Sequence, residues 1–462
     1  MLLDNLKAIV GPGGWTCDPE ALEPYLTEWR NVLRGETRIM VSPSTTDEVS
    51  RVVSACASER VGIVPQGGNT GLCGGAIPDE TGDQVLLSTA RLNRIRSIDP
   101  QDYSMIVEAG CILSAIQDKA RKHDRYFPLS LAAEGSCQIG GNLSTNAGGI
   151  NVIRYGTARR HVLGLEVVLA DGTIWDGLRS LRKDTAGYDM KQVFIGSEGT
   201  LGIITAASLQ LYPDPGELTT AFVAIRSAFH SVELLAALRT SLADRIQAFE
   251  LISDRALRFV VRHIPGTRMP FDKEHRWYVL IDVAQGRDDG LLEQELMRSI
   301  EEDLALDVIV AKSIAEADAL WRLRHSISEA QKHEGASLKH DISVPVGSIG
   351  NFLERAQSLV DKFIPNARLC TFGHVGDGNL HYNISQPKDG NLEEFKTRGA
   401  DLSDAIYELV TGIGGSISAE HGIGTLKKEC LARYCSATEL DLMQSLKRAL
   451  DPLNTLNPGK VI

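Results

Sequence analysis

The pattern of apolar and polar positions near the beginning of the chain predicts a strand, a helix and a second strand. TRIMV (residues 37–41) and VGIVP (residues 61–65) are short apolar runs of strand length. Between them, apolar residues recur at helical spacing from Val49 to Cys56. Thr45 and Glu48 stand ahead of this helical pattern in the order of a capping box, so we expect the helix to begin there.

The second half of the chain has a different rhythm. Long apolar runs such as IQAFELI (residues 246–252) and RWYVLIDVA (residues 276–284) alternate with stretches of helical spacing. This alternation predicts an α+β fold whose second half contains a largely antiparallel sheet.

A cluster of two prolines and a glycine, Pro213, Pro215 and Gly216, marks the boundary between these rhythms. We therefore expect three segments: a first domain, a second α+β domain, and a C-terminal segment that returns to the first domain. Their expected bounds are 1–212, 213–415 and 416–462.

Composition narrows the classes of protein. The 462 residues are 43% hydrophobic and 23% charged, which is ordinary for a globular protein, and the net charge of −12 argues against nucleic acid or an anionic membrane as partner. We find neither a secretory signal nor a run of the roughly 20 apolar residues that an integral membrane helix needs. The eight cysteines are scattered without a CxxC pair, which indicates buried, reduced thiols and a cytoplasmic protein.

Three glycine-rich loops interrupt the strand-rich first half. They are PQGGNTGLCGG (residues 65–75), GSCQIGGNLSTNAGG (135–149) and IGSEGTLGIIT (195–205). Neither the dinucleotide fingerprint GxGxxG nor the phosphate-binding GxxxxGK[ST] loop occurs. Clustered backbone N–H groups with neutral Asn, Ser and Thr side chains suit a diphosphate. The alternative is that each loop only turns the chain between strands.

These loops, together with RYGTARRHVLGLEVVLADG (residues 154–172), closely resemble the FAD-binding domain of the vanillyl-alcohol oxidase superfamily. The resemblance is strongest to the FAD-linked D-2-hydroxyacid dehydrogenases, the branch with D-lactate, glycolate and D-2-hydroxyglutarate dehydrogenases. It extends from about residue 37 to the end, where NPGK (residues 457–460) belongs to the same pattern.

The resemblance implies that all three loops bind FAD. The expected cofactor-binding residues are Pro65, Gly67, Gly68, Asn69, Thr70, Gly71, Ser136, Gly140, Gly141, Asn142, Ser144, Thr145, Asn146, Glu198, Gly202, Ile203 and Ile204. Because the first loop has no histidine to tether the flavin, we expect FAD to be bound non-covalently. Cys73 and Cys137 are the alternative tethers, although structural thiols are the simpler interpretation of both.

A second motif, GHVGDGNLHYN (residues 373–383), places two histidines around a tight turn. His374 and His381 are seven apart, which in a straight strand would send them to opposite faces, but the Gly-Asp-Gly-Asn turn could fold both imidazoles together. Two histidines with Glu420 from SAEHGIG (residues 418–424) would match a catalytic zinc site with an open position, and manganese or iron would also suit this set. The alternative is a hairpin whose histidines are incidental.

The resemblance favours the metal. In the D-2-hydroxyacid dehydrogenase family, HxGDGNxH and a later GEHG loop supply the ligands, which implies that His374, His381 and Glu420 bind it here. The chain has Ala419 where the family frequently has glycine. We expect His421 to be the general base, because histidine suits proton transfer near neutral pH. His421 as a fourth ligand or as a hydrogen-bonding support is the alternative.

The nature of the substrate depends on a third region. Arg324 and Ser328 are four apart on one expected helix, and Lys339 leads the following strand. Arginine and lysine side chains such as Arg324 and Lys339 are usually solvated charges on the surface. However, family members that act on D-2-hydroxyglutarate carry Arg, Thr and Lys there, which implies a pocket for a second carboxylate. Asn383 would then contact the C1 carboxylate.

We therefore predict an FAD-dependent D-2-hydroxyacid dehydrogenase that acts on CH–OH donors. Its substrate would be a dicarboxylate such as D-2-hydroxyglutarate, oxidised by metal-assisted proton removal and hydride transfer to the flavin. The alternatives are a D-lactate or glycolate dehydrogenase, a D-malate dehydrogenase, and a non-catalytic flavin-binding subunit. An electron-transfer flavoprotein or a quinone would accept the electrons. A homodimer is an oligomeric state that the sequence leaves open.

Overall fold

The computed structural model describes residues 2–286 and 290–462, and their contacts form two compact units. The first unit comprises the chain up to Gly149, Gly156–Asp214 and Glu420–Ile462. The second unit comprises Ile150–Tyr155 and Pro215–Ala419. The short segment Ile150–Tyr155, which contains helix α6 (Val152–Tyr155), groups with the second unit, and the apolar pattern gave no indication of this.

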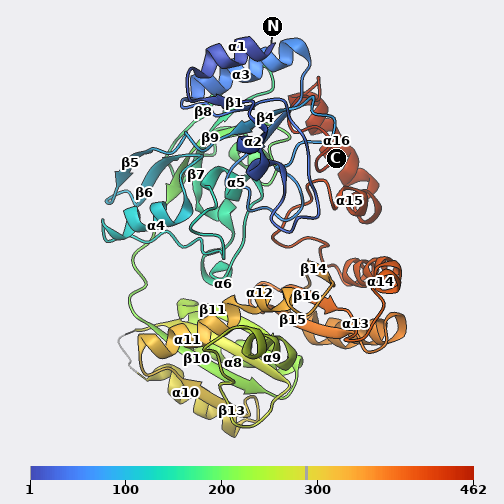
Figure 1. Cartoon of the computed structure of the whole chain (residues 1–462). Coiled ribbons are helices and arrows are strands. Elements are labelled where there is room, and N and C mark those ends of the chain that lie inside the picture. Colours follow the sequence, from blue (N-terminus) through green and yellow to red (C-terminus); the bar gives the residue numbers. More distant parts are fainter. Residues whose placement is uncertain (1, 287–289) are drawn as a thin grey trace. The chain divides into compact units, whose positions relative to one another are not determined.

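The first unit contains two sheets (Figure 1). A four-stranded sheet in the order β1-β2-β4-β3 is parallel except for β1. A five-stranded sheet in the order β5-β6-β9-β7-β8 is antiparallel throughout. The strands are β1 (Trp15–Thr16), β2 (Met40–Val41), β3 (Ile63–Gln66), β4 (Val85–Ser88), β5 (Ile95–Asp99), β6 (Ser104–Glu108), β7 (Val162–Val168), β8 (Ile174–Gly177) and β9 (Ile203–Gln210).

The helices of the first unit are mostly short. They are α1 (Leu2–Val10), α2 (Pro19–Leu26), α3 (Thr46–Glu59), α4 (Leu113–Arg121), α5 (Ile139–Ser144), α7 (Lys191–Phe194), α15 (Lys428–Tyr434) and α16 (Ala437–Leu450). Two apolar cores result. Helices α1 and α3 cover the four-stranded sheet, and α4 and α5 cover the five-stranded one.

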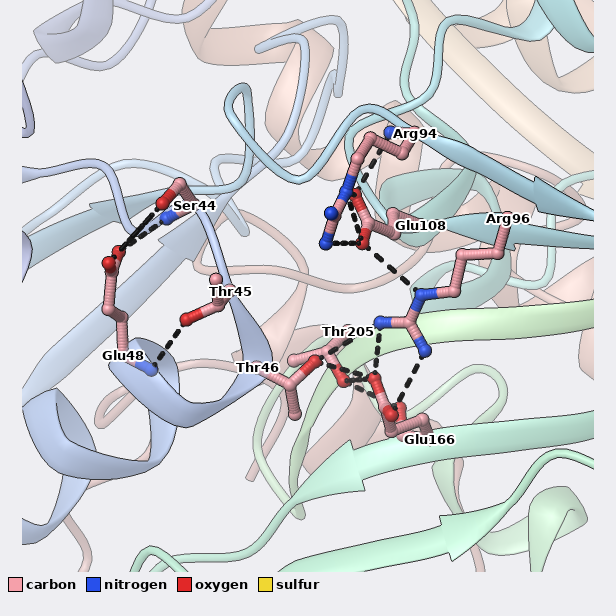
Figure 2. Close-up of polar contacts among 9 residues, drawn as sticks. All are labelled: Ser44, Thr45, Thr46, Glu48, Arg94, Arg96, Glu108, Glu166 and Thr205. Carbon is pink, nitrogen blue, oxygen red and sulfur yellow. Dashed lines mark hydrogen bonds and ion pairs between the residues drawn. The ribbon is translucent and has the colours of Figure 1, made fainter.

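Helix α3 begins where the sequence predicts. The Thr45 hydroxyl accepts the Glu48 backbone N–H at 3.1 Å, as in a capping box. The Glu48 carboxylate, however, accepts the backbone N–H of Ser44 at 2.7 Å, one residue before the N-cap (Figure 2). The first bond satisfies a backbone donor that the first turn of a helix leaves without an intrahelical partner, and the second fixes the residue that precedes the N-cap.

A charge network ties α3 to the five-stranded sheet. Figure 2 shows Arg96 of β5 between two carboxylates, with Nη2 at 2.9 Å from Glu166 and Nε at 3.2 Å from Glu108. Hydroxyls of Thr46 and Thr205 also donate to Glu166, at 2.6 and 2.8 Å. Burial alone would raise the pKa of Glu166, but Arg96 and the two hydroxyls offset it and leave the pKa lowered. The network therefore stabilises the fold at neutral pH and loses this contribution as the pH falls through the lowered pKa.

The C-terminal segment lies against the N-terminal strands of the same unit. Leu456 forms an isolated parallel bridge with Ile63 of β3, and Figure 1 shows the C-terminal helices α15 and α16 in red. Asn457 donates from Nδ2 to the backbone oxygens of Gly75 at 2.8 Å and Glu198 at 2.7 Å. The first residue of NPGK thus holds two glycine-rich loops in place.

The second unit is built on one seven-stranded sheet in the order β13-β10-β12-β11-β15-β16-β14, antiparallel at every pairing. The predicted α+β class is thereby confirmed. The strands are β10 (Leu218–Ile225), β11 (Ile246–Ser253), β12 (Trp277–Ala284), β13 (Asp307–Val310), β14 (Ser337–Ser343), β15 (Arg368–His374) and β16 (Asn379–Ser385).

The helices of the second unit lie on both sides of this sheet. Helices α9 (Asp254–His263), α11 (Ile314–His325) and α12 (Ile327–Lys332) pack into one apolar core with residues of β10, β11, β12 and β15. Helices α8 (Ala228–Leu242), α13 (Ile349–Phe363) and α14 (Leu392–Gly412) pack against one another and against strands of the same sheet, and α10 (Leu291–Glu301) contacts α8. We call the side that contacts α9, α11 and α12 the site face.

Two sequence-based expectations need correction. The single helix expected to carry both Arg324 and Ser328 is broken at Ser326, so α11 ends at His325 and α12 begins at Ile327. Three of the eight cysteines, Cys17, Cys430 and Cys435, are only partly buried, although no disulfide joins cysteines among the described residues. Among residues 2–286 and 290–462, no helix is long and apolar enough to cross a membrane.

Replacing Arg96 with methionine should destabilise the first unit by roughly 3 kcal/mol, because it leaves the buried Glu166 charge with hydroxyl partners alone. Circular dichroism during thermal unfolding would measure the change. The control is Arg38→Met, whose partner Asp83 is 71% exposed, so its loss should shift the midpoint little. Equal shifts for both variants would contradict the assigned role of the network.

Candidate active site

A cavity of about 290 Å³ lies within the first unit, and all three glycine-rich loops line it. Of the expected cofactor residues, fifteen line the cavity: Pro65, Gly67, Gly68, Asn69, Thr70, Gly71, Gly140, Gly141, Asn142, Ser144, Thr145, Glu198, Gly202, Ile203 and Ile204. The sequence did not predict that Leu131, Ala132 and Ala133 line it as well. No glycine or polar cluster marks those three residues.

Two expected cofactor residues do not line the cavity. Ser136 is exposed, and its backbone oxygen would be 2.1 Å from a Cβ added at Gly68. The Asn146 side chain accepts the backbone N–H of Arg159 at 3.0 Å and so holds its own loop. Both residues therefore contact backbone of the loops and are not among the residues that line the cavity.

The glycines of the loops are required for different physical reasons. A Cβ at Gly140 would be 2.7 Å from the Cβ of Ala109, so the backbone there needs a close approach. A Cβ at Gly71 or Gly141 would meet no atom within 4 Å, since both residues face open space at the cavity. That open space is available to a ligand.

Polar groups of the second loop fit a ligand with hydrogen-bond donors. The buried Oδ1 of Asn142 has no hydrogen-bond partner within the described chain, which is rare for a buried polar atom. The hydroxyls of Ser144 and Thr145 instead donate to the helix carbonyls of Gly140 and Gly141, at 2.7 and 3.2 Å. The loops thus offer backbone and amide groups to a cofactor, and these fit the flavin that the resemblance implies.

Glu198 closes one side of the cavity. Its residue adopts a φ of 50°, and its carboxylate accepts the backbone N–H groups of Ile423 at 2.7 Å and Gly424 at 2.9 Å. Burial raises the pKa of this carboxyl, although the two backbone bonds and Lys427 act in the opposite direction. Glu198 thereby joins the third glycine loop to the loop that follows His421.

Glu420 and His421 border this same cavity. The Oε1 atom of Glu420 accepts the backbone N–H of Gly149 at 2.7 Å. A Cβ added at Gly148 would lie 2.9 Å from the same oxygen. The end of the second glycine loop therefore fixes the Glu420 carboxylate beside the cavity.

The histidine turn is a hairpin between β15 and β16. Asp377 accepts the Asn379 backbone N–H at 2.9 Å, and Gly378 adopts a φ of 79° with its missing Cβ only 2.0 Å from the Val344 oxygen. The turn makes His374 pair with Asn379 and Phe372 pair with His381. Both histidines therefore lie on the site face.

The two imidazole rings face each other edge to face, with centroids 5.8 Å apart. Each ring has a buried carboxylate beside its Nδ1. Glu250 of β11 accepts a hydrogen bond from His374, and Asp341 of β14 lies 3.8 Å from the Nδ1 of His381. A carboxylate behind each histidine is the arrangement that orients metal-binding imidazoles, so the pair fits two ligands of a divalent metal.

Glu250 also contacts Arg324, which makes it a polar residue of the site that the sequence did not predict. Arg324 is only 8% exposed, and its Nε donates to Glu250 at 2.7 Å. Burial would raise the pKa of Glu250, yet His374 and Arg324 lower it to about 2. The sequence feature that could have indicated Glu250 as a site residue is that it is the single carboxylate inside the apolar run IQAFELI.

The remaining expected substrate residues are distributed unevenly. Lys339 lies directly opposite Asn383 across β14 and β16, so their side chains share the site face. Both Arg324 and Lys339 act electrostatically on the buried Cys370 thiol of β15. Ser328, in contrast, is exposed on α12 beyond the helix break, so the structure does not pair it with Arg324 through a continuous helix.

Comparison with known proteins identifies the class. A family described as "FAD binding domain" matches residues 37–177, and one described as "FAD linked oxidases, C-terminal domain" matches residues 215–461. The p-cresol methylhydroxylase structure with substrate bound aligns with 100% of this chain and 96% of its own at a TM-score of 0.78 and 18% identity, which supports the shared fold. The predicted fold of the vanillyl-alcohol oxidase type is confirmed.

Two relatives narrow the family. The mitochondrial D-2-hydroxyglutarate dehydrogenase of Arabidopsis thaliana is 38% identical over 99% of this chain and 80% of its own. The D-2-hydroxyglutarate dehydrogenase of Xanthomonas citri pv. viticola is 38% identical over 96% of this chain and 93% of its own. The chain therefore belongs to the FAD-linked D-2-hydroxyacid dehydrogenase family, and the predicted class of FAD-dependent enzyme is confirmed.

Replacing Gly141 with valine should weaken FAD binding about tenfold, because the side chain would occupy cavity space without meeting protein atoms. Flavin content after dialysis, with circular dichroism as a check of folding, would measure this. Gly347→Val is the matched control, since Gly347 also has no atom within 4 Å of an added Cβ and lies in the second unit. Full flavin retention by Gly141→Val would contradict the assignment of the cavity.

Proposed function

We propose that this enzyme oxidises a dicarboxylic D-2-hydroxyacid, with D-2-hydroxyglutarate as the first candidate, to the 2-oxoacid. The observation that carries the proposal is the site face of the second unit, where His374 and His381 lie on the same face as Lys339, with Arg324 buried against it. A substrate with two carboxylates can use both cations. The names of the two relatives, both D-2-hydroxyglutarate dehydrogenases, support the same substrate.

The two units have complementary roles in this proposal. The first unit binds FAD in its cavity, and the second unit binds the substrate. Glu420 and His421 border the cavity of the first unit, whereas His374 and His381 belong to the second. His374, His381 and Glu420 would hold a divalent metal, with zinc first and manganese or iron as alternatives.

Bound FAD would supply the hydride acceptor, and the bound metal would supply a Lewis acid. The side chains of the protein do the remaining work. His421 accepts the hydroxyl proton of the substrate. Arg324 and Lys339 bind the distal carboxylate, and Arg324 can do so with two N–H donors. One N–H of the Asn383 amide donates to Gln331 at 3.0 Å, and its second N–H binds the C1 carboxylate.

Non-covalent FAD is part of the proposal. Cys73 and Cys137 both line the cavity and are buried. Burial raises the pKa of the Cys137 thiol, which disfavours the reactive thiolate. Acid precipitation should therefore release the flavin into solution.

Several finer expectations stay predictions. An electron-transfer flavoprotein or a quinone would take the electrons from the reduced flavin. The homodimer also stays a prediction about the oligomeric state. The cytoplasmic location also stays a prediction, since the Arabidopsis relative is named mitochondrial and the name of the Xanthomonas relative carries no compartment. D-malate fits the same two cations as D-2-hydroxyglutarate. D-lactate and glycolate have no distal carboxylate for Arg324 and Lys339 to bind, and a non-catalytic flavin subunit would not need these residues.

Anaerobic D-2-hydroxyglutarate should bleach the visible absorption of the flavin, and prior treatment with a chelator should abolish fast bleaching. Stopped-flow absorbance would measure the rate, and restored zinc should restore it. Bleaching by D-lactate but not by D-2-hydroxyglutarate would contradict the proposal that the substrate is a dicarboxylic acid. Bleaching that survives complete metal removal would contradict the role of the metal.

Replacing Lys339 with methionine should raise KM for D-2-hydroxyglutarate about 30-fold, equivalent to about 2 kcal/mol for a lost charged hydrogen bond. KM for D-lactate should change little, because D-lactate has no distal carboxylate. Lys362→Met, on the exposed surface of α13, serves as control. Equal losses with both substrates would place Lys339 at the shared end of the substrate.

A further inference from the structure

Glu250 occupies an unusual position for a carboxylate. It lies on β11, the central strand of the seven-stranded sheet, and is fully buried at 0% exposure. Its neighbours along the strand, Phe249 and Leu251, are core residues. A buried charge is unfavourable without compensation, so the two partners of Glu250 must account for its position.

The first partner is His374. The two residues pair directly across β11 and β15, and one carboxylate oxygen, Oε1, accepts a hydrogen bond from Nδ1 of the imidazole. With Nδ1 acting as the donor, Nε2 is the nitrogen that would bind a metal. Glu250 thereby fixes both the tautomer and the ring orientation of His374.

The second partner is Arg324. The other carboxylate oxygen, Oε2, accepts from Nε at 2.7 Å, and the guanidinium carbon lies 4.6 Å from the centre of the Phe372 ring. Binding through Nε fixes the plane of the guanidinium and leaves its terminal nitrogens as the groups that can meet a carboxylate.

We propose that Glu250 is a positioning residue that couples metal binding at His374 to recognition of the distal substrate carboxylate at Arg324. This inference rests on the proposed function. It goes further in assigning one residue to both ends of the substrate.

The coupling follows from charge sharing. When Nε2 of His374 binds a cation, the Nδ1–H group becomes a stronger donor and draws the negative charge of Glu250 toward itself. Arg324 is then neutralised less by Glu250 and attracts a substrate carboxylate more strongly. Metal binding and dicarboxylate binding should therefore strengthen each other by the same factor.

The second unit contains a matched control for Glu250. Glu334 is also buried, at 8% exposure, and also bridges a histidine and arginines, with His263 at 2.7 Å, Arg262 at 3.0 Å and Arg368 in contact. Arg368 and His374 are the two ends of β15, roughly 20 Å apart at the rise of a strand. Glu334→Gln therefore removes a similar buried charge whose partners are Arg262, His263 and Arg368, and not His374 or Arg324.

The experiment compares FAD-loaded wild type, Glu250→Gln, Glu250→Asp and Glu334→Gln. Chelator competition gives the zinc Kd. The flavin absorbance change on adding 2-oxoglutarate or pyruvate, with and without zinc, gives the Kd of each 2-oxoacid. Both acids have the same 2-oxoacid head, so only the distal carboxylate distinguishes their response to zinc. Thermal melting shows whether each variant folds.

We expect Glu250→Gln to weaken zinc binding about 10- to 100-fold. In wild type and Glu334→Gln, zinc should strengthen 2-oxoglutarate binding about fivefold more than pyruvate binding, and Glu250→Gln should lose this difference. Glu250→Asp, which keeps the charge, should recover part of both effects. If Glu250→Gln matches Glu334→Gln in zinc and 2-oxoacid binding, Glu250 is merely structural and the inference is wrong.

The outcomes separate this inference from the proposed function. In one outcome, no D-2-hydroxyacid bleaches the wild-type flavin, but Glu250→Gln still weakens zinc binding and removes the effect of zinc on 2-oxoglutarate binding. The proposed function is then wrong and the coupling stands. If bleaching succeeds while Glu250→Gln binds zinc normally, the coupling is wrong and the function stands. Wild-type protein that binds no zinc would overturn the coupling, and bleaching alone would then decide the function.

Discussion

The arrangement of the site face in the second unit depends on the buried carboxylate of Glu250. Glu250 sits in the middle of the central strand, and a lone charge there would destabilise the fold by several kcal/mol. Its two partners come from β15 and α11, so compensating this charge fixes a strand and a helix against β11. The same contacts orient a histidine and an arginine toward the site face. Stability and preorganisation of the site thus have one physical origin.

The first unit solves a related problem with backbone groups. Glu198 is also buried, but its partners are the N–H groups of Ile423 and Gly424, and Asn457 binds the backbone of the same loops. Loops that surround a cavity cannot pack against a core on every side. Long-range hydrogen bonds from the C-terminal segment hold them open, and Glu420 is fixed by the same device through Gly149.

Local sequence patterns predicted local structure well where one residue type has one physical use. Thr45 caps α3 as expected, and the Gly-Asp-Gly-Asn turn brings His374 and His381 together. Prediction failed where spacing was extended through an assumed helix. Ser326 breaks that helix, so the relation expected between Arg324 and Ser328 does not hold. Ser136 and Asn146 belong to the same motifs, yet they are not among the residues that line the cavity.

The sequence by itself determined the class of fold, the three glycine-rich loops and the identity of the chemical groups, because these depend on short-range geometry and on motifs with fixed spacing. Only the tertiary structure decided which of these groups meet. The partnership of Glu250 with Arg324 and His374 joins residues 74 and 124 positions apart. An apolar run with one carboxylate does not specify its partners, since they are chosen by strand order and by the requirement that a buried charge be compensated.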